Sequence, residues 1–284
     1  MTISLSESRE FTGLDEARGY PGADQYPQDT HPEAATGPVS IKHPGLEAIS
    51  AALREGVADW KAFRTDVVVN VVIYPLACAL LAGVILDRAL LPFVFPICAG
   101  VALVGPIATI WFAALSRQRE RDGTATSDAA AAIFDSPRRL TVQRLALLLI
   151  GLFALWIVVA GVLYSLTLGR VAGGSFFGNL FATTPGNIML VLGVLLGAGF
   201  ALVALAIGLV GFQLALDREM GVGEVVALSV RTALANRQLS LAWGGVVVAG
   251  LVLGSLPGLL GLSITVPVLG HASWHLYRRL LTSE

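Results

Sequence analysis

Two histidines, His271 and His275, lie four residues apart near the end of the 284-residue sequence. On a helix this spacing places both rings on one face. Two histidines so spaced can share a zinc ion, and one of them can ligate a haem iron. Either group needs ligands from other helices, and the apolar stretches of the chain hold no third histidine and no acidic residue, only Cys78 and Cys98. We therefore expect no metal ion and no cofactor at this pair.

The neighbours of the two histidines suit a membrane interface. Trp274 and Tyr277 lie beside them, and Arg278 and Arg279 follow. Aromatic and basic side chains of this kind gather at the depth of the lipid headgroups. A neutral histidine there can donate a hydrogen bond to a carbonyl or hydroxyl oxygen. We expect the pair to lock the last helix against its neighbours; the alternatives are a metal or haem site and the binding of a lipid headgroup or a partner protein.

The composition places these residues in a membrane protein. Hydrophobic residues make up 55% of the chain and charged residues 14%, whereas a soluble domain carries about 25% charge. Seventeen of the 39 charged residues lie in the first 66 positions, and the stretches 145–168 and 188–216 contain none. With two cysteines and a net charge of −1, the chain is neither a soluble enzyme, nor a disulfide scaffold, nor a nucleic-acid binder.

Six membrane spans are predicted from the apolar runs, at about 67–86, 90–115, 140–168, 188–216, 239–255 and 259–277. The last run is too long for one span, and the turn at 255–258 divides it. Fifteen of the 19 Lys and Arg residues lie beside the start of the first span, in the loops between spans two and three or four and five, or after span six. The positive-inside rule then predicts that both termini are cytoplasmic.

The polar segments between the spans also show a pattern. Residues 1–45 carry seven acidic residues and several prolines, which is typical of a disordered tail. Amphipathic helices are predicted at 46–64, 127–135 and 222–236, each before a pair of spans. The first has Trp60 on its apolar stripe and Glu55 and Asp59 on the polar face. We expect it to lie in the membrane interface or to pack on the end of the bundle. The predicted fold is therefore all-α, a six-helix transmembrane bundle (46–281) with amphipathic interfacial helices before the hairpins.

Few polar groups interrupt the spans. Asn70 and Tyr74 in the first span could line a cavity for a neutral solute, although proline kinks packed by neighbouring helices are the commoner arrangement. No charged residue lies deep in a span, which argues against proton coupling. Gly193 and Gly197 lie one helical turn apart, so they favour close helix packing within the bundle or, alternatively, a homodimer.

The stretch Pro267–Arg279 resembles the signature Pro-x-Leu-Gly-His-Ala-Thr-Trp-His-Leu-Tyr-Arg of a family of uncharacterised bacterial integral membrane proteins, with Ser273 in place of threonine. This is a domain-of-unknown-function family, and some members are labelled cytochrome c oxidase subunits. The resemblance covers about residues 40–281 and includes Asp217, Arg218, Ser229 and Asn236. It implies six spans and a bacterial inner membrane, and it supplies no activity.

Asp217 and Arg218 end the fourth span, where we expect Asp217 to pair with a basic residue of a neighbouring cytoplasmic segment, for example Arg231 or Arg237. No catalytic residue is predicted. The sequence favours a non-enzymatic accessory, assembly or membrane-organising component. The alternatives are a transporter or channel for a small neutral or lipid-like solute and a haem- or metal-binding respiratory component. The expected partners are the lipid bilayer and other membrane proteins or a second copy of the chain, and not nucleic acid.

Overall fold

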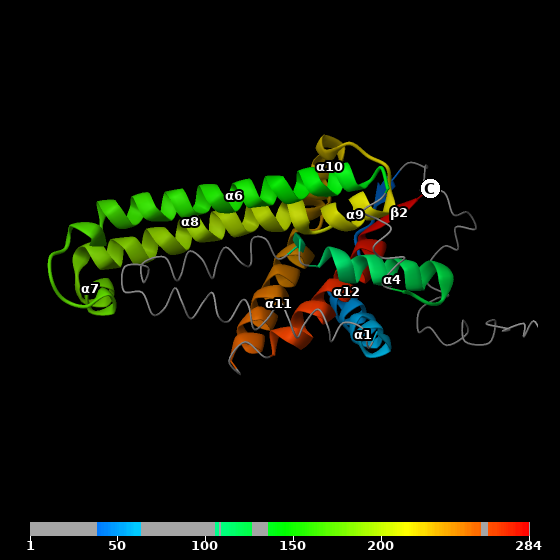
Figure 1. Ribbon diagram of the computed structural model, residues 1–284, viewed down its shortest axis with the longest axis horizontal. Coiled ribbons are helices and arrows are strands. Elements are labelled where there is room, and N and C mark those ends of the chain that lie inside the picture. The colour runs from blue at the N-terminus through cyan, green and yellow to red at the C-terminus, as the bar shows by residue number, and fades with distance from the viewer. Residues whose placement is uncertain (1–38, 64–105, 108, 127–135, 257–260, 284) are drawn as a thin grey trace, which may run out of the picture.

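The computed structural model describes residues 39–63, 106–107, 109–126, 136–256 and 261–283 (Figure 1). These residues are almost entirely helical. The elements are, in chain order, β1 (Val39–Ile41), α1 (Glu47–Ala62), α4 (Ile110–Asp122), α6 (Arg139–Leu166), η4 (Leu168–Arg170), α7 (Phe176–Ala182), α8 (Thr184–Gly208), α9 (Gly211–Asp217), α10 (Val222–Ala235), α11 (Arg237–Ser255), α12 (Leu262–Leu280) and β2 (Leu281–Ser283).

Among the described residues, three helical segments are long and apolar enough to cross a membrane: α6 (Arg139–Leu166), the segment Thr184–Asp217 that comprises α8 and α9, and α11 (Arg237–Ser255). They coincide with the third, fourth and fifth predicted spans. The first predicted span lies outside the described residues, and the second overlaps them only at its C-terminal end, in α4. The sixth corresponds to α12, which is not among the three. The all-helical, apolar character is thus established, and the number of six spans remains a prediction.

The helices α6 and α8 form a long antiparallel hairpin whose far end carries α7 (Figure 1). At the start of α8 the hydroxyl of Thr183 accepts a hydrogen bond from the backbone N–H of Gly186 at 3.1 Å, which caps the helix. Gly197 lets α6 approach closely, because a Cβ at this position would lie 3.3 Å from the ring of Trp156. This glycine therefore serves packing within the hairpin.

A break at Leu209 and Val210 separates α8 from α9. The hydroxyl of Ser229, which comes from α10, lies 2.8 Å from the carbonyl of Ala206 and 3.4 Å from the backbone N–H of Val210. Backbone groups released at a helix break need such partners. Ser229 therefore holds α10 against the break and has a structural role there.

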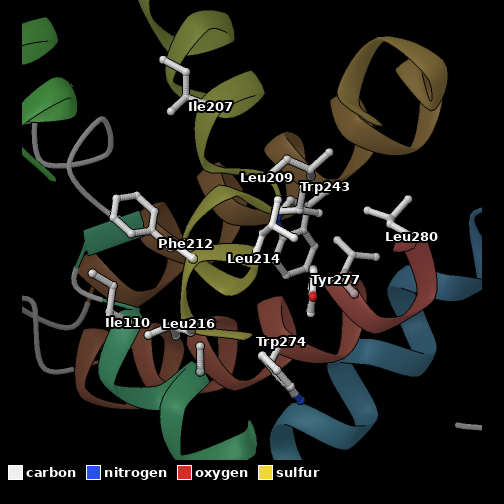
Figure 2. Close-up of a cluster of buried hydrophobic side chains, with 14 of the residues drawn as sticks. Ile110, Ile207, Leu209, Phe212, Leu214, Leu216, Trp243, Trp274, Tyr277 and Leu280 are labelled. Atoms are coloured by element: carbon white, nitrogen blue, oxygen red, sulfur yellow. The ribbon is translucent and has the colours of Figure 1, made fainter. Parts of the chain in front are cut away.

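The hydrophobic core lies where α9 meets α4, α11 and α12 (Figure 2). Phe212, Leu214 and Leu216 project from α9 and are fully buried. Trp274 and Tyr277 enter the same core from α12 and are 2% exposed. Burying a large apolar side chain contributes about 1.5–3 kcal/mol, so this short helix anchors the last helix of the chain.

The helix α1 packs along α12, as the blue and red ribbons of Figure 1 show. Its buried stripe includes Ala52, Gly56 and Asp59, whereas Trp60 on the predicted apolar stripe is only half-buried. A Cβ at Gly56 would lie 2.7 Å from the backbone nitrogen of Ala272. The two helix backbones are therefore in direct contact. The predicted helix is present, and two acidic residues of its polar face, Glu55 and Asp59, are buried because the small residues beside them let α12 approach.

A short antiparallel sheet joins the two ends of the described chain. Val39 pairs with Ser283 and Ile41 with Leu281, and the N–H of Lys42 donates to the carbonyl of Leu280 at 2.8 Å. Residues 39–41 fall inside the segment predicted as a disordered tail, so ordered structure begins earlier than residue 46. Strands of three residues are too short to leave a period in the sequence.

Candidate functional site

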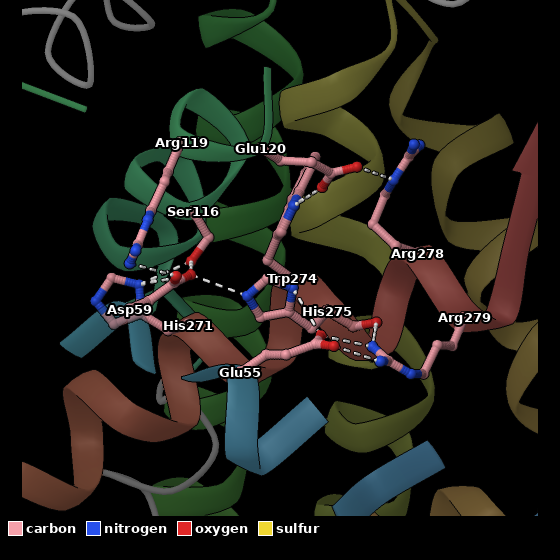
Figure 3. Close-up of polar contacts among 10 residues, drawn as sticks. All are labelled: Glu55, Asp59, Ser116, Arg119, Glu120, His271, Trp274, His275, Arg278 and Arg279. Carbon is pink, nitrogen blue, oxygen red and sulfur yellow. Dashed lines mark hydrogen bonds and ion pairs between the residues drawn. The ribbon is translucent and has the colours of Figure 1, made fainter. Parts of the chain in front are cut away.

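Asp59 is the centre of a buried polar cluster formed by α1, α4 and α12 (Figure 3). Its side chain is completely buried. Oδ2 lies 2.5 Å from the hydroxyl of Ser116 and 2.9 Å from Nε2 of His275, and Oδ1 lies 3.1 Å from Nη1 of Arg119. One carboxylate of α1 thus receives hydrogen bonds from two other helices.

His271 reaches the same carboxylate through Ser116. Its Nδ1 lies 2.8 Å from the hydroxyl oxygen of Ser116, and its ring stacks on Phe63 with centroids 5.5 Å apart. Ser116 has a single proton, and the short contact assigns that proton to the bond with the Asp59 carboxylate. His271 must therefore donate from Nδ1, which assigns its tautomer from the hydrogen-bond network.

His275 lies between two carboxylates. Its Nε2 donates to Asp59, and its Nδ1 lies 3.2 Å from Oε2 of Glu55, an ion-pair contact outside hydrogen-bonding geometry. The fully buried ring of His275 therefore bridges the two acidic side chains of α1.

Glu55 in turn forms a two-pronged ion pair with Arg279. Nη2 and Nη1 of Arg279 lie 2.7 and 2.9 Å from the two carboxylate oxygens, and Nη1 also donates to the carbonyl of His275 at 3.0 Å. The planar guanidinium matches a carboxylate in this way, whereas a lysine cannot. The pair fixes the rotation of α1 about its own axis relative to α12.

A second set of contacts ties α12 to α4 and α9. Glu120 accepts hydrogen bonds from Nε1 of Trp274 at 2.6 Å and from Nε of Arg278 at 2.8 Å. Asp217 accepts from the hydroxyl of Tyr277 at 2.8 Å. The polar ends of both buried aromatic side chains are thus satisfied by carboxylates, as buried indole and phenol groups require.

Asp217 also pairs with Arg117, whose Nε lies 3.1 Å from Oδ1. A basic partner was expected, and Asp217 has one, but this partner is Arg117 and neither Arg231 nor Arg237. Arg237 instead donates to the carbonyl of Leu234 at 3.1 Å. The carboxylate of Asp217 is instead occupied by groups of α4 and α12, because Arg117 and Tyr277 both donate to it.

The remaining predicted residues lie apart from this cluster. Asn236 donates to the carbonyl of Lys42 at 3.1 Å and so attaches the α10–α11 junction to the chain before α1. Arg218 is 6% exposed and follows α9 directly. Ser229 serves the helix break. The cavity candidates Asn70 and Tyr74 lie outside the described residues.

The charge of Asp59 is stabilised in place. Burial by itself raises the pKa of this carboxyl. The hydrogen bond and charge of His275, the charge of His271 and the hydrogen bond of Ser116 lower the pKa, and together they outweigh burial, so the net pKa lies below its ordinary value. Asp59 is therefore ionised at neutral pH although water does not reach it.

Ser116, Asp59 and His271 are the residue types of a hydrolytic triad, but their order differs. In a triad the histidine lies between the serine and the carboxylate and removes the serine proton. Here the serine lies between the other two, donates to Asp59 and accepts from His271. All three side chains are fully buried. This arrangement stabilises helix contacts and does not activate the serine.

The residues that the sequence interpretation missed are Glu55, Asp59, Ser116, Arg119 and Glu120. The sequence pattern placed the acidic pair on the polar face of an amphipathic helix, and such a face is normally solvated. A usable signal was present, since Ala48, Ala52 and Gly56 recur every four residues beside Glu55 and Asp59. Small residues at this spacing predict a close helix contact.

Within the described part of the chain, no group of three or more His, Cys, Asp or Glu side chains is arranged to hold a metal ion. Cys78 and Cys98 lie outside that part. His271 and His275 are directed to different partners, Ser116 and the two carboxylates of α1. The cluster can hold charge and orient protons between helices.

Comparison with known proteins gives a family but no described relative. The chain matches no curated protein and no solved structure. The match to a family model covers α4, α6, α8 and α9, and it ends at Asp217, before the stretch that resembles the C-terminal signature. A family model described as "Predicted integral membrane protein (DUF2189)" matches residues 94–217, less than half of the chain, which agrees with the resemblance to uncharacterised membrane proteins.

Proposed function

We propose that the chain is a six-span protein of the bacterial inner membrane with both termini in the cytoplasm, acting as a non-enzymatic accessory, assembly or membrane-organising component. The observation that carries this proposal is the closed polar cluster of α1, α4 and α12. Asp59, Ser116, His271 and His275 are fully buried and are hydrogen-bonded to one another. These hydrogen bonds hold the three helices together.

The distribution of basic residues supports the proposed orientation. The C-terminal end of α4, the start of α6 and the end of α9 lie at one end of the α6–α8 hairpin, and α7 lies at the other (Figure 1). The first end carries Arg117, Arg121, Arg138 and Arg218, whereas Arg170 is near the second. Basic residues concentrate on the cytoplasmic side of membrane proteins.

The surface of the hairpin supports a role in contact with lipid or another membrane protein. Leu147 of α6 and Leu195 of α8 are 66% and 63% exposed. Large exposed apolar surfaces face hydrocarbon or a partner. The glycines that could serve a homodimer are used in part within the hairpin. A Cβ at Gly193 would lie 3.7 Å from the side chain of Leu163, and one at Gly197 would meet the ring of Trp156.

The test is site-specific photo-crosslinking in native membranes. A photoreactive amino acid at Leu147 or Leu195 should give a discrete adduct with a second membrane protein or a second copy. The same group at Leu149, which is fully buried in α6, is the control and should give no intermolecular adduct. Adducts with lipid alone would overturn the proposal. Saturable solute uptake in proteoliposomes, or one haem per purified chain, would assign the alternative functions instead.

A further inference from the structure

Among the residues that the structure describes, Arg138 at the N-terminal end of α6 has no acidic side chain closer than 4.0 Å. Its side chain is 15% exposed, and its Nε is buried without a hydrogen-bond partner. The nearest paired carboxylate, Glu219, lies 4.0 Å from Nη2 and is itself 59% exposed. An exposed pair at this distance contributes little, and an unsatisfied buried donor is costly. Within the described residues, the guanidinium of Arg138 therefore lacks a hydrogen-bond acceptor for Nε.

The charged residues around Arg138 add repulsion and offer it no further free carboxylate among the described residues. Arg117 is paired with Asp217 at 3.1 Å, and Arg121 with Asp122 at 3.0 Å, so the nearby acids already have partners. Burial lowers the pKa of Arg138, the charge of Arg117 lowers it further, and the attraction of Glu219 and Asp217 offsets these effects only in part. An anion placed here would remove the repulsion and satisfy the guanidinium.

The length of α6 places Arg138 at headgroup depth. Its 28 residues rise by about 1.5 Å each, or about 42 Å in all. The bilayer with its headgroup layers measures about 40–45 Å. Both ends of α6 then lie among the headgroups, and the exposed side chains of Leu140 and Leu147 lie on the hydrocarbon side of Arg138.

We propose that Arg138, assisted by the charges of Arg117 and Arg121, binds the phosphate of an anionic phospholipid in the leaflet at the N-terminal end of α6. A guanidinium donates two parallel hydrogen bonds to phosphate oxygens, and basic sites between helices at this depth bind anionic headgroups. The depth of the site favours a lipid over a free phosphate ion. The inference rests on α6 crossing the membrane and not on the proposed partner protein.

The test uses the purified full-length protein in detergent, titrated with phosphatidylglycerol or phosphatidylcholine and observed by native mass spectrometry. We expect preferential binding of phosphatidylglycerol, and Arg138→Gln should weaken it at least about tenfold, or about 1.4 kcal/mol. Arg139→Gln is the matched control, because Arg139 is the exposed neighbour, and it should bind nearly as the wild type. Arg138→Lys keeps the charge but loses the two parallel N–H donors of the guanidinium. Its affinity for phosphatidylglycerol should be intermediate, which would show that the site has kept its fold.

The outcomes are distinct from those of the crosslinking experiment, because no partner protein is present. Equal binding of the two lipids, or equal losses in the Arg138 and Arg139 variants, would overturn the proposal. Displacement of phosphatidylglycerol by an excess of inorganic phosphate would show a general anion site and overturn the assignment to a lipid headgroup. Retention of the lipid in that excess would support it.

Discussion

Replacing Asp59 by asparagine tests whether the polar cluster holds α1 against α12. Asparagine has nearly the same shape, but it removes the charge that faces His275 and Arg119 at 2.9 and 3.1 Å. Removing one partner of a buried ion pair costs about 3–5 kcal/mol, and we expect the lower limit because the amide oxygen still accepts one hydrogen bond. At about 2–4 °C per kcal/mol for a domain of 150–250 residues, the melting temperature should fall by about 6–12 °C.

The measurement is thermal unfolding of the purified protein in detergent, followed by tryptophan fluorescence. Asp122→Asn is the matched control: the same substitution in an ion pair whose carboxylate is 39% exposed should cost less than about 1 kcal/mol. The double variant Asp59→Asn, His275→Gln should lose less free energy of unfolding than the two single variants together, and the difference should be about 1–3 kcal/mol. Equal melting temperatures for the two asparagine variants, or strict additivity in the double variant, would refute the reasoning.

The remaining predictions concern the same assembly. Because the native pKa of Asp59 is lowered, its stabilisation is complete above the ordinary value of 3.8 and is lost as the pH falls below it; the melting difference between wild type and Asp59→Asn should shrink there, and a constant difference would contradict this. Gly56→Ala should destabilise the protein, since the new methyl group meets the backbone of α12 at 2.7 Å, whereas Gly245→Ala on the open face of α11 should change little. His271→Ala should lower stability without loss of a metal ion or haem, as metal analysis and optical spectra will show; one tightly held zinc or haem per chain would contradict the structural role. Reporter fusions after positions 88, 178 and 256 should report the outside and those after 125, 222 and 284 the cytoplasm, and a cytoplasmic signal at 178 would exclude six spans.

The long helices could be predicted because their signal is local. The third and fifth spans were expected at 140–168 and 239–255, and the helices run over Arg139–Leu166 and Arg237–Ser255. Length and absence of charge are sufficient for such segments. The break between α8 and α9 was missed, because the apolar run continues through it and the residue that hydrogen-bonds to its backbone, Ser229, belongs to another helix.

The polar cluster could be predicted only in part. The two histidines stand out by spacing, but their partners come from far along the chain: Asp59 is 216 residues before His275, and Ser116 is 155 before His271. The sequence of an amphipathic helix looks the same whether its acidic residues face solvent or are covered by another helix. The contact between α1 and α12 is what buries the acidic residues, and this contact forms by tertiary packing.

This contact also explains the unusual composition of α12. A helix with two histidines and a buried serine is costly to place in hydrocarbon, where each polar group needs a partner. In α12 these groups face other helices: His275 meets Asp59 of α1, His271 meets Ser116 of α4, and Ser273 accepts from Gln213 of α9 at 2.7 Å. The polar face of α12 is thus tolerated because α1, too polar to cross a membrane itself, supplies the acids that cover it. The position of the last helix therefore depends on the docking of the first described one, and the two form a single structural unit.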